Sequence, residues 1–456
     1  GVSQVANRAA GRDPNQMWSS TDPRLSAMAD VSLKEATKVW AYVGFNSFGG
    51  PAGQIAVMHR EIVDEREWIG ERRFLHALNY CMVLPGPEAQ QLATYVGWLL
   101  NGVRGGVIAG TLFILPGAVV MLALSVLYAV YGDVSWVSGL LFGLQAAVVA
   151  IVVQALIRVA RRTLRSRALR LIAVAAFVAL FFFAVPFPLV ILAAGLIGWW
   201  VGRRDHTPIE DGEADPPTPP GRRRWALIAA VASLALWLVP VALLVMVLGT
   251  EHILTQEALL FSKTAVVSFG GAYAVLAYIS QQAVQYYNWI TTEDMTTGLG
   301  LAETTPGPLI LVVQFVGFLA AYNNPGTLPP LLAGLLGALV TLWVTFLPCF
   351  MFIFAGAPYV DALRRSRGLH HALNGVGAAV VGVIANLALW FALHTFFETQ
   401  TRSFGPMTVT VPQWATLDLI AVLLAGLAVV LVFVLKWPTL RVLGVVAGLG
   451  ALVSLV

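Results

Sequence analysis

The sequence predicts an all-α polytopic membrane protein made of two homologous, inverted repeats with re-entrant, broken helical hairpins. Composition is the first reason: 58% of the 456 residues are hydrophobic and 11% are charged, whereas soluble proteins carry roughly 25% charged residues. Long apolar stretches and short motifs that recur at a constant spacing are the other two. A soluble globular fold is excluded.

Apolar stretches of about the 20 residues that a helix needs to cross a bilayer recur along the chain. They are Val107–Tyr131, Leu140–Ile157, Trp225–Leu248, Leu331–Ala355, Leu373–Leu393, Leu417–Leu435 and Val442–Val456. Cys81 and Cys349 lie in apolar runs without metal-ligand spacing, so we expect buried thiols, no metal and no cofactor. The net charge of +4 gives no indication of nucleic-acid binding.

The chain repeats itself. Ser-Phe-Gly-Gly at Ser47–Gly50 recurs at Ser268–Gly271, 221 positions later, and Pro-Gly-Pro at Pro85–Pro87 recurs at Pro306–Pro308 with the same spacing. Beyond a longer loop, the spacing becomes 232 and aligns the Leu-Pro pairs at Pro116 and Pro348. Recurring motifs in one register predict two copies of one unit.

The two copies and the segments outside them divide the chain into four predicted parts. They are a polar N-terminal segment (1–30), the first membrane repeat (31–202), a cytoplasmic linker rich in proline and arginine (203–224) and the second, inverted repeat with additional helices (225–456). The linker composition cannot build a core and is typical of an exposed connection.

The placement of Lys and Arg orients the two copies oppositely, because these residues favour cytoplasmic loops. The loop His59–Arg73 has four arginines, but its counterpart Ser280–Asp294 has none. Arg158–Arg170 has six, against one in Leu393–Pro412. We therefore predict a cytoplasmic N-terminus and linker, an external loop at Leu393–Pro412 and an external C-terminus, the plan of secondary transporters with a midplane site.

The repeated motifs mark predicted helix breaks. Because Arg60–Arg73 and Arg104 both lie inside, the segment between them must enter and leave on one side, with Pro85–Pro87 at its tip. Lys34–Val63 forms a second hairpin, with Phe48–Pro51 at its turn, and the second copy repeats both. Helices that start after such breaks offer free N–H groups and a positive dipole end, which suit anions. For each motif alone, a packing role is the alternative.

Three ionisable residues lie within apolar segments, where each costs about 2.5–3.5 kcal/mol at a helix centre and is usually functional. They are Glu88, Lys263 and Glu303, and each breaks the repeat symmetry. Lys263 could neutralise a dianion and a carboxylate could carry a proton. A purely structural Lys–Glu pair is the alternative.

The candidate substrate-binding residues surround the breaks. They are Ser47, Phe48, Gly49, Gly50, Gln54, Pro85, Gly86, Pro87, Glu88 and Gln91 in the first copy, and Lys263, Ser268, Phe269, Gly270, Gly271, Glu303, Thr305, Pro306, Gly307 and Pro308 in the second. We assign no catalytic residue, because no nucleophile–base pair or phosphate loop is present in the sequence.

Several strings resemble the chromate transporter family in its long, two-domain form. They are Phe48–Ala56, Trp68, Phe74, Leu84–Pro87 and Gln91–Ala93, followed by Phe269–Gly271, Tyr273–Leu276, Trp289, Thr305–Pro308, Gly317 and Phe346–Pro348. The resemblance covers roughly residues 33–200 and 256–395. It implies chromate efflux across the inner membrane, drawing on the proton motive force, by a protein that is not an enzyme.

Three positions depart from the pattern of that family: Gln54, where histidine is common, Glu88, where a small or hydroxyl residue is common, and Glu303, where glutamine is common. Chromate and sulfate are both tetrahedral dianions, so transport of sulfate or another oxyanion is the first alternative. A non-transport membrane scaffold or enzyme is the second. Lipid, an oxyanion, protons and a second copy of the chain are the expected partners.

Overall fold

The computed structural model describes residues 31–132, 134–203, 220–269, 271–360, 366–404 and 407–455. Within these ranges, five helices are long and apolar enough to cross a membrane. The spans are Glu88–Tyr131, Ser135–Thr163, Gly221–Leu248, Pro330–Tyr359 and Arg367–Phe396. Strands form a single two-stranded hairpin in the described part of the chain. The prediction of an all-α polytopic membrane protein is confirmed.

The first half of the chain folds into short helices followed by long ones. They are α2 (Leu33–Asn46), α3 (Gly50–His59), the π-helical turn η2 (Arg60–Glu65), α4 (Glu71–Cys81), α5 (Glu88–Tyr131), α6 (Ser135–Thr163), α7 (Arg167–Phe183) and α8 (Phe187–Gly202). Helix α9 (Pro220–Leu248) follows and leads into the second half.

The second half follows the same order. Its elements are α10 (Ile253–Val267), α11 (Ala272–Ser280), the π-helical turn η3 (Gln281–Tyr286), α12 (Thr292–Thr304), η4 (Leu309–Leu311), α13 (Val312–Asn323), α14 (Pro330–Gly356), η5 (Ala357–Tyr359), α16 (Arg367–Phe396), β1 (Thr399–Phe404), β2 (Met407–Pro412), η6 (Trp414–Thr416), α17 (Leu419–Val429), η7 (Val430–Val434) and α18 (Thr439–Val453).

Irregular backbone features recur at the repeat spacing. The π-helical turns η2 and η3 begin 221 residues apart. After each, the chain turns through a non-glycine residue of positive φ, Glu67 or Asn288, both with φ 51°. The N–H of Trp68 then donates to the Ile62 carbonyl and that of Trp289 to the Ala283 carbonyl, each at 2.8 Å. Equivalent sequence positions therefore share even their least regular conformations.

Helix α5 contains a re-entrant arm. Asn101 and Gly102 leave the helical conformation, with φ 64° at Gly102. Helix segments on either side then pack together: a Cβ on Gly106 would lie 3.0 Å from the Thr94 carbonyl oxygen, and one on Gly110 would overlap the Thr94 hydroxyl. The chain reverses direction at Gly102, so the first part of α5 folds back along the second part, the shape expected of a re-entrant hairpin.

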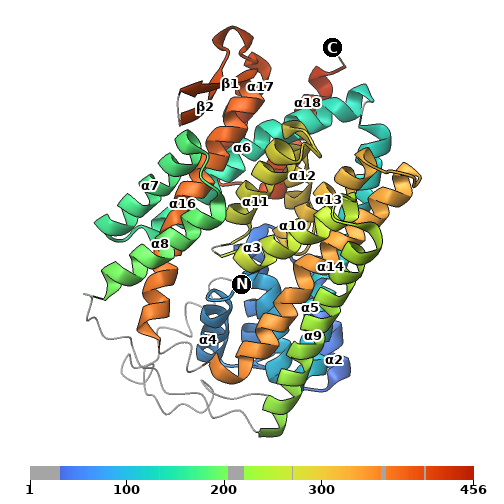
Figure 1. The fold of residues 1–456 in the computed structure, drawn as a ribbon, viewed down its shortest axis with the longest axis vertical. Coiled ribbons are helices and arrows are strands. Elements are labelled where there is room, and N and C mark those ends of the chain that lie inside the picture. The colour runs from blue at the N-terminus through green and yellow to red at the C-terminus, as the bar shows by residue number, and fades with distance from the viewer. Residues whose placement is uncertain are drawn as a thin grey trace, which may run out of the picture.

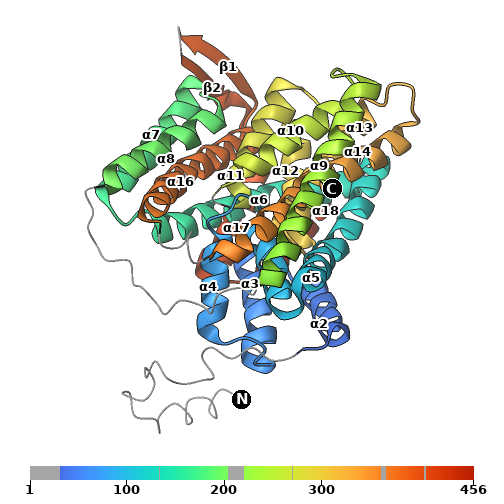
Figure 2. The ribbon, with the colours of Figure 1, turned by 60° about the horizontal axis from the view of Figure 1, so that its bottom comes forward.

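The long helices assemble around the short ones. α16 packs against α6, α7 and α8, whereas α14 packs against α9, α10 and α13. Figure 1 shows α7, α8 and α16 on one flank of α11 and α12, and α9, α13 and α14 on the other. The turned view in Figure 2 keeps α7, α8 and α16 together at one side. Buried residues of both halves join into one large apolar cluster that includes Val148, Val275, Phe315 and Val380.

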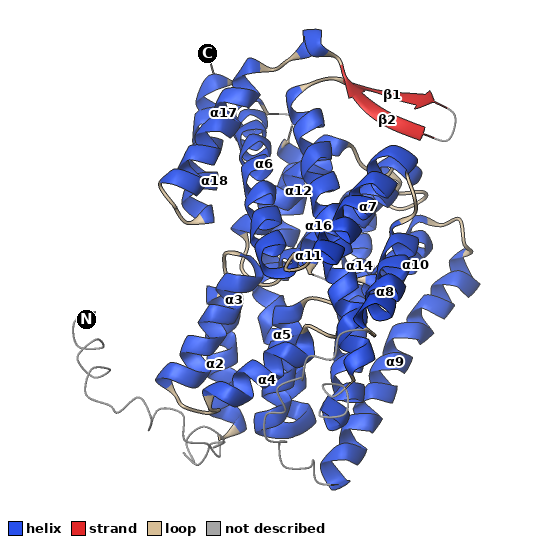
Figure 3. Ribbon diagram, turned by 90° about the vertical axis from the view of Figure 1, so that its left-hand side faces the viewer, coloured by secondary structure: helices blue, strands red, loops and turns tan. Residues whose placement is uncertain are grey.

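The β1–β2 hairpin is antiparallel, with Thr399 opposite Pro412 and Phe404 opposite Met407. Figure 3 shows it at the end of the molecule opposite α2 and α4, near the end where α18 leads to the C-terminus. The external position of the loop Leu393–Pro412 stays a prediction.

The predicted start of the helix after the linker needs correction. α9 begins at Pro220 rather than at Trp225, because its first turn packs against the first half. The guanidinium of Arg222 donates to the carbonyl oxygens of Trp98 and Leu99, at 2.6 Å for Leu99, and stacks over the Trp98 ring. The N-terminal segment 1–30, the linker residues 204–219, Gly270, Arg364 and Arg365 lie outside the described residues.

Candidate functional site

Four helix breaks lie where the sequence predicts them. α2 ends before Ser47 and α3 starts at Gly50; α10 ends at Val267 and α11 starts at Ala272. In each Pro-Gly-Pro motif, the central glycine has a positive φ, 123° at Gly86 and 84° at Gly307. Proline excludes helical backbone before it and supplies no N–H, so each motif ends one helix and another begins beyond it.

The breaks of one half are bonded to those of the other. The N–H of Gly86 donates to the Ser268 carbonyl oxygen at 2.9 Å, and the N–H of Gly307 donates to the Ser47 carbonyl oxygen at 2.8 Å. Both donors and both acceptors are repeat equivalents, 221 positions apart. The four breaks, which form the tips of the hairpins, therefore meet as two pairs. Each pair joins a break of one half to a break of the other, and the repeat relates the two pairs.

Side-chain amides support the same contacts. The Nε2 of Gln54 donates to the Gly307 carbonyl oxygen at 2.6 Å, and the Nε2 of Gln91 donates to the Pro85 carbonyl oxygen at 2.6 Å. Both glutamines are buried. Since polar backbone is tolerated at membrane depth only where other groups satisfy it, these amides are structural supports of the tips.

The long proline-containing helices close over the tips. A Cβ on Gly117, next to Pro116 in α5, would overlap the Pro306 carbonyl oxygen. A Cβ on Gly86 would lie 3.0 Å from the Sγ of Cys349, the repeat equivalent of Gly117 in α14. Each half thus covers the Pro-Gly-Pro tip of the other half.

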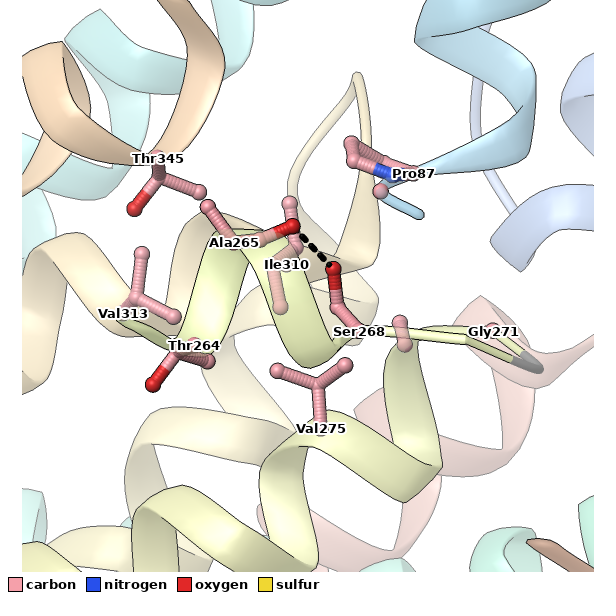
Figure 4. A pocket seen from close by; sticks show the side chains of 11 residues that line it. Pro87, Thr264, Ala265, Ser268, Gly271, Val275, Ile310, Val313 and Thr345 are labelled. Atoms are coloured by element: carbon pink, nitrogen blue, oxygen red, sulfur yellow. Dashed lines mark hydrogen bonds between the residues drawn. The ribbon is translucent and has the colours of Figure 1, made fainter. Parts of the chain in front are cut away.

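A small cavity lies between the tips, with about 20 Å³ of internal space. It is lined by Gly86, Pro87, Thr264, Ala265, Ser268, Gly271, Ala272, Val275, Ile310, Val313 and Thr345. Figure 4 shows Pro87 of the first half, Ser268 and Gly271 of the break between α10 and α11, and Thr345 of α14 around it. Such a volume holds about one water, so the structure is a closed form that must open to admit a larger anion.

Backbone N–H groups are the donors that the tips can offer. The hydroxyl of Ser47 donates to the Val43 carbonyl oxygen and that of Ser268 to the Ala265 carbonyl oxygen, so both hydroxyl protons are engaged within their own helices. Thr305 does the same with Ala302. Helices α3 and α11 begin without a side-chain cap, which leaves their first N–H groups for solvent or a ligand.

Two glycines at the tips, Gly50 and Gly271, have a backbone conformation that favours glycine, and the space where a side chain would lie is open. Gly50 has φ 70° and Gly271 has φ 94°, and a Cβ at either position would have no heavy atom of the described residues within 4 Å. Gly50 is the first residue of α3 and Gly271 directly precedes α11, so both lie at helix starts without a side-chain cap. A ligand can therefore approach the backbone at both places, whereas a side chain would fill that space.

The two predicted carboxylates have partners other than Lys263. The Tyr273 hydroxyl donates to Oε1 of Glu303 at 2.5 Å, and Arg158 lies near enough to interact electrostatically with Glu303. Arg162 has the corresponding relation to Glu88. Arg158 and Arg162 are four residues apart on α6 and hence lie on one face of that helix.

The alternative of a structural Lys–Glu pair is not found among the described residues, where Glu303 bonds to Tyr273. Lys263 is exposed, and its ammonium lies 5.9 Å from the centre of the Tyr278 ring. It is also absent from the residues lining the cavity between the tips. The next residue, Thr264, does line the cavity, so helix rotation separates the two positions, which sequence spacing did not resolve.

The remaining predicted residues at the helix breaks differ in their exposure. Phe48 and Phe269 are half-buried, Gly49 is exposed, and Pro306 and Pro308 are buried.

Three residues that the sequence pattern did not single out also line the site or its surroundings: Thr264, Thr345 and, deeper in the bundle, Glu257. Glu257 lies in the same apolar helix as Lys263. The cost of a charge in such a helix is therefore a signal that could have found it.

A larger cavity of about 460 Å³ opens between α5, α6, α12 and α13. Its wall includes Tyr128, Gln145, Glu293, Asp294 and Thr297. The Tyr128 hydroxyl donates to Asp294 at 2.5 Å and the Gln145 amide to Thr297 at 2.9 Å. This wall is polar and acidic, whereas the repeat equivalents of Glu293 and Asp294 are arginines.

One ionisable cluster lies outside the membrane-spanning helices. His59 contacts Glu71 at 2.5 Å and Asp64 at 3.2 Å. Burial lowers the pKa of His59, but the hydrogen bonds and negative charges of Glu71 and Asp64 outweigh it, so the pKa is raised. Within the described ranges, no group of three His, Cys, Asp or Glu side chains could hold a metal ion.

Comparison with known proteins finds relatives along most of the chain. The chain is 33% identical over 410 residues to the chromate transport protein of Pseudomonas aeruginosa, covering 86% of this chain and 90% of that one. It is 26% identical over 399 residues to a probable chromate transport protein of Synechococcus elongatus (86% and 93% covered). It is 26% identical over 384 residues to the chromate transport protein of Cupriavidus metallidurans (83% and 87%). No solved structure matches the chain significantly.

The sequence profile of the chromate transporter family matches residues 35–199 and 255–453. These two segments contain the four helix breaks and leave out α9, which joins the halves. With crossed tips between the halves and apolar helices around them, this chain belongs to the chromate transporter family and is a multi-pass membrane transporter rather than an enzyme.

Proposed function

We propose that this chain exports chromate across the inner membrane, binds the anion at the four helix breaks and draws on the proton motive force. The observation that carries the proposal is the crossed pairing of the tips, Gly86 with Ser268 and Gly307 with Ser47. It brings the starts of helices from both halves to one place, where N–H groups can surround an anion. The names of the relatives supply chromate as the substrate.

Binding at the tips requires the closed cavity to open. Its internal space of about 20 Å³ excludes a tetrahedral oxyanion, so α10 and α14 must move apart from the Pro-Gly-Pro tip of the first half. The open space beside Gly50 and Gly271 then lets the anion reach backbone N–H groups. This sequence of events is typical of alternating access between inverted repeats.

Charge asymmetry between equivalent surfaces supports export. Arg72 and Arg73 occupy the first turn of α4, on the side that we assign to the cytoplasm. Their equivalents Glu293 and Asp294 line the larger cavity, on the side that we assign to the outside. A positive entrance raises the local concentration of an anion and a negative one lowers it. Chromate is thereby attracted from inside and repelled outside.

The topology on which this direction rests is the inverted repeat, with residues 31–202 and 225–456 as its two halves and the linker between them in the cytoplasm. α9 supplies the additional crossing that inverts the second half. The formation of a homodimer stays a prediction that no contact in the described residues tests.

The experiment that tests the proposal is uptake of radiolabelled chromate into everted membrane vesicles, with and without an imposed proton gradient. Export predicts accumulation in everted vesicles that carry the chain and none in vesicles with an empty vector. Unlabelled sulfate in excess is the specificity control. Accumulation in right-side-out vesicles alone would reverse the assigned direction of transport. Complete competition by sulfate would show a general oxyanion site rather than one specific for chromate.

A further inference from the structure

Glu257 is a buried carboxyl group without a polar partner. It lies in the second turn of α10, its exposure is 0%, and within the described part of the chain neither carboxyl oxygen has a hydrogen-bond partner. Its Oε2 lies only 3.0 Å from the point where a Cβ on Gly337 would be. Glu257 therefore points into the packed interface with α14, where a glycine leaves room for its carboxyl group.

In the described residues, the helices packed around Glu257 bring no positive charge to it. Helices α9, α11, α13 and α14 pack against α10. In α13 and α14 the sequence holds no Asp, Glu, Lys, Arg or His, and the titratable groups are Tyr322 and Cys349. In α9 the charged residues are the arginines 222–224, at the far end of the helix, and α11 has only Tyr273 and Tyr278.

Lys263 on α10 and His252 just before it have contacts other than Glu257. Lys263 is exposed and lies over the Tyr278 ring. His252 caps the helix and accepts from the Leu254 N–H. An ionised carboxylate buried without a partner costs several kcal/mol, and such a group takes up a proton instead. In this closed structure Glu257 is therefore a carboxylic acid.

Polar residues lie on α10 and α14 between the level of Glu257 and the cavity between the tips. Thr264 follows Glu257 by 7 residues and lies on the same face of α10, and Ser268 directly follows the end of that helix; both line that cavity. On the facing helix α14, the hydroxyls of Thr341 and Thr345 are buried and lack a partner among the described residues, and Thr345 also lines the cavity. The same two helices thus enclose the carboxyl group and the cavity, about 10 Å apart along α10.

We propose that Glu257 is the proton-binding site of this transporter and that its proton and the oxyanion bind in alternation. The proposal rests on the proposed function. In the closed form, α10 and α14 hold Glu257 away from water as an acid and leave the cavity too small for the anion. Separation of the two helices admits the anion and exposes Glu257, whose O–H bond then breaks to give a carboxylate and a proton that passes to water.

Alternating occupancy has a thermodynamic consequence. Because the anion-bound form is the one that has lost the proton, anion binding releases a proton, and a proton that binds from outside favours release of the anion. The inward proton gradient then drives export of the anion. The proton site is separate from the N–H groups at the tips, so the two functions can be tested separately.

The first experiment uses dicyclohexylcarbodiimide, which reacts with protonated carboxyl groups in apolar surroundings, on the purified wild-type protein. We expect mass spectrometry of the peptides to find the adduct on Glu257, with labelling slowed several-fold by saturating chromate. Sodium chloride at the same ionic strength is the control. Absence of an adduct on Glu257, or equal protection by sodium chloride, would overturn the assignment.

The second experiment measures the proton release that accompanies chromate binding in weakly buffered detergent solution. Wild-type protein should release protons, E257Q should bind chromate without that release, and E251Q, which removes an exposed carboxylate just before α10, should match the wild type. Release from E257Q equal to that of wild type would overturn the proposal. If the wild type binds no chromate but Glu257 is labelled, the proposed substrate fails and the proton site stands.

Discussion

The N–H of Gly86 donates a 2.9 Å hydrogen bond to the carbonyl oxygen of Ser268, which ties the second break of one half to the first break of the other. Its repeat equivalent joins Gly307 to Ser47 at 2.8 Å. Neither half can therefore complete its tips alone. Opening of the cavity must break or rearrange at least one of these bonds, and this coupling makes the two halves respond together.

The glycines at the tips should be intolerant of large side chains. Gly50→Leu and Gly271→Leu should abolish chromate transport, because a side chain would occupy the open space from which an anion reaches the backbone. Gly50→Ala adds the same backbone strain, about 1–2 kcal/mol, with far less volume, and should keep part of the activity. Vesicle uptake and the amount of inserted protein are the measurements.

A control separates the tip effect from a general effect of adding leucine. Gly426 lies in α17 with no heavy atom within 4 Å of its Cβ position, and it is exposed. Gly426→Leu should transport at the wild-type rate. Normal transport by Gly50→Leu and Gly271→Leu would return these glycines to a packing role.

Gln54 should matter for stability. Its amide donates to the Gly307 carbonyl at 2.6 Å in a buried setting, so Gln54→Leu leaves an acceptor unsatisfied, which costs about 1–3 kcal/mol. We expect a lower melting temperature in detergent. Gln285→Leu, at an exposed position, is the control and should leave the melting temperature unchanged. Equal melting temperatures for both variants would show that the bond contributes nothing.

Tyr273 and Glu303 should behave as a pair. Tyr273→Phe removes the donor of the 2.5 Å bond to Glu303, and we expect a loss of about 1–3 kcal/mol in stability. Combining it with Glu303→Leu, which removes the acceptor too, should cause less than the sum of the two single losses. Lys263→Gln should have little effect, since Lys263 is exposed. Additive losses in a double-mutant cycle would contradict the pairing.

Stability should depend on pH through His59. Its pKa is raised in the folded protein by Glu71 and Asp64, against the effect of burial. Protonated His59 therefore stabilises the fold fully below its ordinary pKa of about 6.5, and this contribution is lost as the pH rises through the raised value. Melting temperatures of wild type and His59→Gln should differ at acidic pH and converge at alkaline pH. A difference that grows with pH would contradict this sign.

The inverted topology predicts opposite accessibility for two engineered thiols. Cys81 and Cys349 are buried, so we expect little maleimide labelling of the native cysteines. Thr401→Cys, in β1, should react with an impermeant maleimide in intact cells, whereas Glu65→Cys, at the end of η2, should react only once the membrane is permeabilised. Labelling of both from the same side would defeat the inverted arrangement.

Much of the fold follows from local sequence. Apolar length determines which segments cross the bilayer, and the breaks at Gly50, Gly86, Gly271 and Gly307 follow from glycine and proline, whose backbone restrictions act within a few residues. The helix start at Pro220 was missed because its reason is distant: Arg222 bonds to carbonyl oxygens of α5.

The sequence by itself determined the membrane class, the repeat and the positions of the four breaks. Only the tertiary structure decided which breaks meet, that Glu303 bonds to Tyr273 rather than to Lys263, and that Glu257 lies unpartnered against α14 in the described part of the chain. Such pairings depend on helix rotation and on contacts between residues far apart in the chain. A helix turns by about 100° per residue, so neighbouring residues in one helix can face the cavity or lipid, and only packing against other helices selects between them.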